Sequence, residues 1–196
     1  MYITFVAKKR ERMVVKINFE NVYELLATAS NFMEATFNSY DKEGNPVLLK
    51  ILIEPHHNPF LPNVFNLCFG PLTIEENIDD TVQIYHEDLN KLFSTIILFS
   101  LTFLQENPKI TVGLDGSCDA RAYLYHRMFR TNKTYLDEYF KALGVDWFVR
   151  LMRNNDYERR PDGFAFFKPK PEPFDYQRPA SDLYRYYMFK LKNKAI

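Results

Sequence analysis

A β-hairpin is predicted for residues 33–53, which read MEATFNSYDKEGNPVLLKILI. In its first part Met33, Ala35 and Phe37 alternate with polar residues, which is the two-residue period of a strand with one buried face. The middle part, DKEGNP at 41–46, combines Gly and Pro in a turn signal, and a strongly apolar strand follows it. We therefore expect a fold organised around antiparallel strands.

Strand-like and helix-like stretches alternate on both sides of this hairpin. A hydrophobic helix is predicted for Leu92–Leu104, with Asp88 as its N-terminal cap, because a carboxylate accepts the free amides of a first turn. Two smaller helices are expected at 119–130 and 135–143, the second closed by Gly144. The other expected elements are a short helix at 21–30 and strands at 2–7, 13–19, 64–69, 110–114, 145–151 and 183–192. Together they predict an α+β fold, a mainly antiparallel twisted sheet with one hydrophobic helix packed across it and smaller helices at the edge.

The composition is that of a globular chain that needs no disulfide or metal to fold. The 196 residues are 46% hydrophobic and hold 25 Lys and Arg against 25 Asp and Glu, so global charge does not attract nucleic acid or anionic membranes. We expect a single domain over 1–196, with the Pro- and aromatic-rich stretch 161–180 as a loop or insertion within it. Cys68 and Cys118 have no CxxC partner, which predicts reduced thiols in a cytoplasmic protein. No cofactor is expected, and the apolar run at 92–104 is too short to span a membrane.

The segment from Asp115 to Arg121, DGSCDAR, is the strongest candidate for chemistry. A predicted strand passes through Gly116 and Ser117 into a helix whose first amides are free, and such a helix start binds anions. On a helical wheel Arg121 falls on the apolar face, so its guanidinium needs a carboxylate or a phosphate-like ligand. We favour a structural ion pair over a phosphate or nucleotide site. The candidate partners of Arg121 in that ion pair are Asp79, Asp80 and Asp115.

The adjacent carboxylates of Asp79 and Asp80 suggest a further use. Paired carboxylates hold the divalent cation in phosphoryl chemistry. Neighbouring residues of a strand point to opposite faces, however, so at most one of the two reaches a given site. With Arg121, this pair makes a phosphate-ligand or nucleotide-binding protein, or a metal-assisted phosphoryl enzyme, the alternative hypothesis.

Binding of RNA or single-stranded DNA is a second alternative. Residues 1–16 hold five Lys or Arg and residues 181–196 hold four. If the two terminal strands pair, their solvent faces form one positive strip, and Tyr184, Tyr186 and Tyr187 add stacking faces. Charged edge strands also protect sheets against aggregation, and Tyr is an ordinary strand residue, so nucleic acid is not the favoured partner.

The stretch 161–180 is suited to docking on a protein partner or on a second copy of the chain. It holds five of the 11 prolines and a group of aromatic residues, Phe164, Phe166, Phe167, Phe174 and Tyr176. The sequence contains no complete catalytic constellation. The leading hypothesis is therefore a non-enzymatic protein-interaction or regulatory module.

Four motifs, in order along the chain, are similar to those of a known family: FNLCFGPL at 65–72, NIDDTV at 77–82, KLFSTI at 91–96 and GSCDARAYLY at 116–125. The chain resembles an uncharacterised bacterial domain family of unknown function, small α+β proteins with Phe-Gly-Asp, Asp-Asp and Gly-Ser-Thr motifs. Pro71 replaces the family Asp, Cys118 the Thr, and Ala122-Tyr123 a Thr-Arg pair, so the apolar skeleton is kept while polar groups are lost. The resemblance implies the α+β fold. With the docking stretch, it leads us to expect a module of a bacterial accessory locus, toxin–antitoxin-like or concerned with phage defence.

Overall fold

The computed structural model describes residues 14–73, 75, 77–79 and 84–192, and these form one mixed sheet with three helices. The strands are β1 (Leu25–Thr28), β2 (Glu34–Tyr40), β3 (Pro46–Pro55), β4 (Val64–Pro71), β5 (Thr111–Asp115), β6 (Phe140–Phe148), β7 (Lys168–Pro173) and β8 (Tyr186–Leu191). The helices are α1 (Leu89–Glu106), α2 (Asp119–Thr131) and α3 (Lys133–Leu136). The strand order is β1-β2-β3-β4-β5-β8-β6-β7, and each neighbouring pair is antiparallel except β4 and β5. The predicted α+β class with a mainly antiparallel sheet is confirmed.

The hairpin predicted at 33–53 forms β2 and β3, with Phe37 directly opposite Leu49. Ala35 and Phe37 on one strand and Leu49 and Ile51 on the other are buried, while the residues between them are more exposed. The alternation in the sequence is therefore the alternation between the core and the outer face of the sheet.

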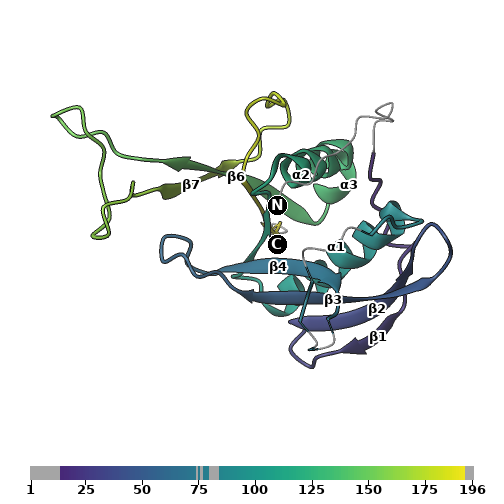
Figure 1. Cartoon of the computed structure of the whole chain (residues 1–196). Helices are drawn as coiled ribbons and strands as arrows, with labels where there is room; N and C mark the ends of the chain where they lie inside the picture. The colour runs from purple at the N-terminus through teal and green to yellow at the C-terminus, as the bar shows by residue number, and fades with distance from the viewer. Residues whose placement is uncertain (1–13, 74, 76, 80–83, 193–196) are drawn as a thin grey trace.

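Helix α1 packs across the sheet against β5 and β8, and α2 packs against the same two strands (Figure 1). The Asp88 carboxylate accepts the Lys91 N–H at 2.9 Å, which confirms the predicted cap. The buried hydroxyls of Ser94 and Ser100 donate to carbonyls one turn back, so a helix surrounded by apolar side chains leaves neither of them unpaired.

Strand β8 is an interior strand between β5 and β6, and its side chains are buried on both faces of the sheet. Tyr187 and Phe189 belong to the main core with the helices, whereas Tyr186 and Met188 belong to a smaller cluster on the opposite face. A Cβ on Gly113 would collide with the Tyr186 ring. Glycine at this position therefore lets the ring lie flat across β5.

Two predicted helices are wrong. Residues 21–30 form no helix, because β1 pairs with the edge of β2 there and tertiary pairing outweighs a weak local preference. The helix predicted at 135–143 ends at Leu136, and β6 begins at Phe140. Gly144 accordingly closes no helix and lies inside β6, opposite Tyr187 of β8.

The strand predicted at 13–19 is also wrong, because residues 14–18 run beside the helices and form no strand pair. The Ile17 N–H donates to Oδ1 of Asn132, and the Asn132 amide donates to the Val15 carbonyl, both at 2.8 Å. The alternation of apolar and polar residues here thus belongs to an extended segment. Its backbone groups form hydrogen bonds with side chains of the helical region. The partner strand predicted at 2–7 lies outside the described residues.

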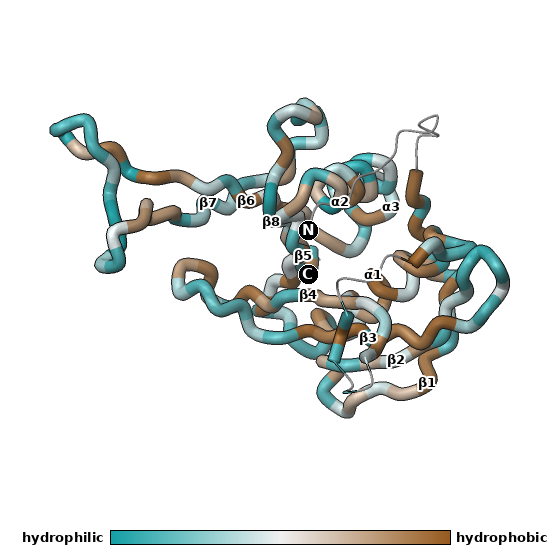
Figure 2. The backbone as a smooth tube through the Cα atoms, in the orientation of Figure 1, coloured by the Kyte–Doolittle hydropathy of each residue, from teal (hydrophilic) through white to brown (hydrophobic). Residues whose placement is uncertain are grey.

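Residues 149–167, here called the arm, continue the β6–β7 hairpin away from the sheet (Figure 1). Two isolated bridges, between Leu151 and Tyr157 and between Arg159 and Ala165, fold it into a short meander. Hydrophobic stretches interrupt its hydrophilic course (Figure 2). At the base of the arm, β7 lies within the Pro-rich stretch 161–180 and is a regular edge strand on β6.

Candidate functional site

The backbone amides of the predicted anion site are already used within the protein. The Gly116 N–H donates to the Arg185 carbonyl at 2.9 Å, and the Ser117 N–H donates to Oδ1 of Asp115 at 2.8 Å. The residue at the N-cap of α2 is Cys118, whose side chain makes no capping hydrogen bond. An anion bound at this turn would therefore have to rely on Arg121 and the first amides inside the helix.

Arg121 is half-buried on α2 and makes no ion pair with another described residue. Burial raises the pKa of the neighbouring Tyr125 hydroxyl, while the charge of Arg121 lowers this pKa and that of Asp115 raises it. The opposing effects place both charges near one buried hydroxyl. The Asp79 N–H donates to the Pro71 carbonyl at 2.8 Å, and Asp80 lies outside the described residues.

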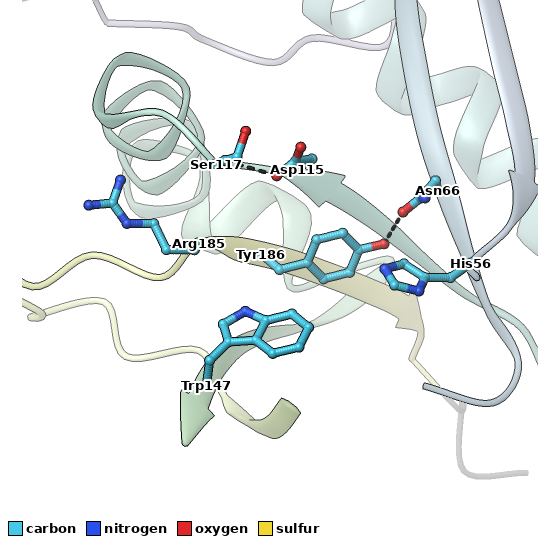
Figure 3. A pocket seen from close by; sticks show the side chains of 7 residues that line it. All are labelled: His56, Asn66, Asp115, Ser117, Trp147, Arg185 and Tyr186. Carbon is cyan, nitrogen blue, oxygen red and sulfur yellow. Dashed lines mark hydrogen bonds between the residues drawn. The ribbon is translucent and has the colours of Figure 1, made fainter. Parts of the chain in front are cut away.

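A polar pocket of about 340 Å³ opens on the sheet face opposite the helices (Figure 3). It is built where β4, β5, β8 and β6 lie next to one another, with one residue from the loop after β3. The pocket is lined by His56, Asn66, Asp115, Ser117, Trp147, Arg185 and Tyr186. Sequence reasoning singled out Asp115, Ser117 and Tyr186 for other purposes and did not bring these seven residues together in one site.

Tyr186 forms the floor of this pocket. Its hydroxyl donates to Oδ1 of Asn66, and its ring meets the His56 ring edge-on at 5.1 Å between centroids. Burial raises the pKa of Tyr186 far above its usual range, and Asp115 raises it further, so the hydroxyl stays protonated at neutral pH. The flat floor rests on Gly113, which was the one local signal of a close approach.

His56 is held in its neutral form. Its Nδ1 accepts the Asn58 N–H at 2.9 Å, which leaves the proton of the neutral imidazole on Nε2. Burial lowers its pKa, a charge on His57 lowers it further, and Asp115 partly opposes them. The imidazole therefore adds no positive charge to the pocket at neutral pH.

The cation on the pocket rim is already paired. Arg185 donates from its guanidinium to Oδ1 of Asp119 at 2.7 Å, and both side chains are well exposed. Asp119 is also the acidic residue of the first turn of α2, where a carboxylate complements the helix dipole. Arg185 thus already has a carboxylate partner on the rim.

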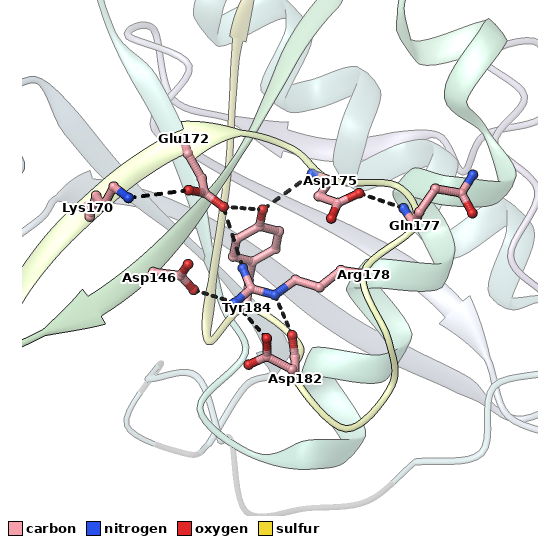
Figure 4. Close-up of polar contacts among 8 residues, drawn as sticks. All are labelled: Asp146, Lys170, Glu172, Asp175, Gln177, Arg178, Asp182 and Tyr184. Carbon is pink, nitrogen blue, oxygen red and sulfur yellow. Dashed lines mark hydrogen bonds and ion pairs between the residues drawn. The ribbon is translucent and has the colours of Figure 1, made fainter.

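A second, more buried cation lies in the loop after β7, against the Tyr184 ring (Figure 4). The Arg178 side chain is only 12% exposed, and its guanidinium pairs with Asp146 at 2.8 Å, Asp182 at 3.3 Å and Glu172 at 3.7 Å. The sequence argument for a buried cation surrounded by carboxylates thus describes Arg178 rather than Arg121. The residue was hidden in the Pro-rich stretch, where no helical period shows which side chains turn inward.

The five predicted docking residues separate into two groups. Phe164 and Phe167 are exposed on the arm, and Phe166 is half-buried against Phe60 at 5.6 Å between centroids. Phe174 is instead buried in the core, and the Tyr176 hydroxyl donates to Asp137 at 3.2 Å. The docking hypothesis is therefore carried by the arm alone.

The predicted basic strip of paired terminal strands does not form. Both edges of β8 are occupied, by β5 and β6, so the described C-terminal strand has no edge for an N-terminal partner. Tyr184, Tyr186 and Tyr187 are buried and present no stacking faces. Elsewhere in the described ranges, no group of three or more His, Cys, Asp and Glu could hold a metal ion. Of the helices that the structure describes, none is long and apolar enough to cross a membrane.

The fold and site together define an α+β domain with a polar pocket on its open sheet face and a projecting hairpin arm. The chain belongs to a family of unknown function (DUF6934), whose model matches residues 19–164. The matched range reaches into the arm and leaves out β7 and β8. This confirms the resemblance found in the sequence. No curated protein and no solved structure matches the chain.

Proposed function

We propose that this protein is an interaction module that binds another protein through the arm. The observation that carries the proposal is the exposure of Leu151, Phe164 and Phe167, which are 77%, 69% and 57% exposed on a segment that projects from the sheet. Large apolar side chains grouped in water are costly, and such groups mark protein-binding surfaces.

The charges of the arm indicate the chemistry of the partner. Arg150 and Arg153 are exposed and make no ion pair with another described residue. The other two arginines of the arm are paired with nearby carboxylates, Arg159 with Asp156 and Arg160 with Asp162. Lys168, at the start of β7, pairs with Glu158 of the arm. The fitting partner surface therefore combines apolar side chains with carboxylates, and arginine with aromatic residues is the composition of many interface centres.

The experiment compares the wild-type chain with the variant Leu151→Ser/Phe164→Ser/Phe167→Ser. Leu26→Ser on β1 is the matched control, because Leu26 is equally apolar and exposed but far from the arm in the strand order. Light scattering first determines whether the partner is a second copy. For a different partner, binding of the two purified proteins is measured. We expect the triple variant to bind at least about tenfold more weakly, and Leu26→Ser to bind as wild type.

The charge of the partner is tested with Arg150→Glu/Arg153→Glu and with added salt. Both should weaken binding, because exposed ion pairs are screened and reversed charges repel. Equal binding by the wild-type chain and the triple variant would contradict the proposal. The proposal would also be contradicted if the wild-type protein stayed monomeric and every protein that it captured were captured by the triple variant as well.

We further propose the finer placement expected from the sequence, a regulatory or accessory role in a toxin–antitoxin-like or phage-defence locus. Membership of a domain family and a projecting docking element support it. A gene neighbour whose product binds the arm would strengthen it. This proposed role would be contradicted if no product of a neighbouring gene bound the arm.

A further inference from the structure

The charge balance of the polar pocket is opposite to that of the predicted anion site. Asp115 and Asp119 carry two carboxylates against the single guanidinium of Arg185, and His56 is neutral. The amides of Gly116 and Ser117 that would hold an anion are engaged. The pocket and its rim therefore carry a net negative charge.

Asp115 is the pocket carboxylate that is held in position to bind a ligand. Its Oδ1 accepts the Ser117 N–H, which fixes the carboxylate against the pocket wall, while Oδ2 makes no hydrogen bond with another described residue. Asp115 lies at the end of β5 and is exposed. A ligand with N–H donors thus meets a positioned carboxylate oxygen together with the Ser117 hydroxyl.

Trp147 supplies an aromatic face on the wall of the polar pocket. Trp147 is 36% exposed, and Figure 3 shows it on the other side of the Tyr186 ring from Asp115 and Ser117. The face of an indole attracts cations, and a planar guanidinium stacks on it while donating in pairs to a carboxylate. A cavity of about 340 Å³ is larger than a bare ammonium ion needs and suits a longer side chain.

We propose that the polar pocket binds a guanidinium group, carried by a free small molecule or by an arginine side chain of a peptide. Asp115 forms the ion pair, Trp147 supplies the stacking face, and Ser117 accepts an additional N–H. The Arg185–Asp119 pair closes the rim without repelling the ligand strongly, because its charges cancel. This site does not depend on docking by the arm.

Trp147 is the single Trp of the chain, so its fluorescence reports on the pocket directly. We would titrate the full chain with methylguanidinium, free arginine and a capped arginine tripeptide. Methylammonium is the cation without a planar face, and urea is the planar neutral analogue. We expect saturable changes with the guanidinium compounds, weaker changes with methylammonium and none with urea. Binding of the tripeptide but not of free arginine assigns the ligand to a peptide, and comparable binding assigns it to a small molecule.

Asp115→Asn separates the proposed role from a structural one. Asparagine keeps the oxygen that accepts the Ser117 N–H, so the turn stays closed while the charge is lost. We expect at least about tenfold weaker binding of the guanidinium compounds by calorimetry, as for loss of a charge-assisted hydrogen bond. Asp162→Asn, an exposed carboxylate of the arm, is the matched control and should bind as wild type.

Three outcomes would overturn the proposal. One is the absence of any saturable change with all three guanidinium compounds at tens of millimolar. Another is equal binding of methylguanidinium by the wild-type chain and by Asp115→Asn, or equal binding of urea and of methylguanidinium by the wild-type chain. The third is tight binding of inorganic phosphate that quenches Trp147 and excludes methylguanidinium, which would return the pocket to the anion hypothesis.

Discussion

The guanidinium of Arg178 lies 4.0 Å from the centre of the Tyr184 ring and 2.8 Å from the carboxylate of Asp146. Burial alone lowers the pKa of Arg178, but hydrogen bonds with Asp146 and Tyr184 outweigh it and raise this pKa above its usual value. Arg178 lies in the loop after β7, and Asp146 lies on β6. The contact therefore fastens this loop to the sheet at β6.

Arg178→Met should destabilise the protein by about 1–3 kcal/mol, because it removes a nearly buried cation and leaves partly buried carboxylates without their partner. Arg185→Met is the matched control. Its ion pair is well exposed and should cost at most about 1 kcal/mol. Urea unfolding of both variants gives the comparison, and equal losses would show that Arg178 is no anchor.

Asn132→Ala should cost about 2–4 kcal/mol. The buried side chain accepts the Ile17 N–H and donates to the Val15 and Met128 carbonyls, so its loss leaves buried backbone groups unpaired. Asn90→Ala removes a similar bond to the Lys16 N–H at an exposed site and should cost much less. Hydrogen exchange at Ile17 supplies the local measurement. Protection unchanged in Asn132→Ala would contradict this account.

Local patterns predicted those parts of the fold that local chemistry decides. The hairpin of β2 and β3 follows from alternation and a Gly-Pro turn, and α1 follows from an apolar run preceded by Asp88. The start of β6 was missed because Phe140–Leu143 also reads as the end of a helix. Its pairing with β7 and β8, which decides the matter, comes from residues more than 20 positions away.

The polar pocket could not be predicted from the sequence, because its lining residues come from five separated segments of the chain. His56, Trp147 and Arg185 carry no shared motif and meet only through the strand order. The signal that did exist was Gly113 inside a strand, which marks a close approach without naming the approaching residue. The partly buried arginine was expected at 121 for a sound reason, since a cation on an apolar face needs a partner.

Gly113→Ala should destabilise the fold by about 1–3 kcal/mol, because the new methyl group meets the Tyr186 ring and hydroxyl. A double-mutant cycle isolates this contact. In a Tyr186→Ala background the same glycine substitution should cost clearly less, which appears as coupling between the two sites. Additive losses would mean that Gly113 is needed for its own backbone rather than for the ring.

The three prolines of β7 should keep this sheet edge from pairing with other strands. The Phe174 N–H donates to the Ala142 carbonyl of β6, so alternate amides face β6 and positions 169, 171 and 173 face outward. Proline at these positions removes the outward donors. Pro169→Thr/Pro171→Thr/Pro173→Thr should therefore self-associate by light scattering. Pro161→Thr in the arm is the control. If the triple variant were as monodisperse as this control, the prolines of β7 would have no protective role.

Stability should fall as the pH drops below about 7, with His126 as a principal cause. Burial lowers its pKa, and Arg130, Arg178 and Arg127 lower it further while Asp175 opposes them. Neither of its ring nitrogens has a hydrogen-bond partner within the described residues. The unfolded histidine, with a pKa of about 6.5, therefore takes up a proton before the folded one.

The free energy of unfolding is thus highest above pH 7 and decreases between this pH and the lowered folded-state pKa, by at most about 1.4 kcal/mol per pH unit for each proton. His56 and His86 contribute in the same direction, because burial lowers their pKa values too. Urea unfolding between pH 5 and pH 8 measures the slope. His126→Phe keeps a ring against Phe174 and should flatten the slope without abolishing it. An unchanged slope would assign the whole effect to the other histidines.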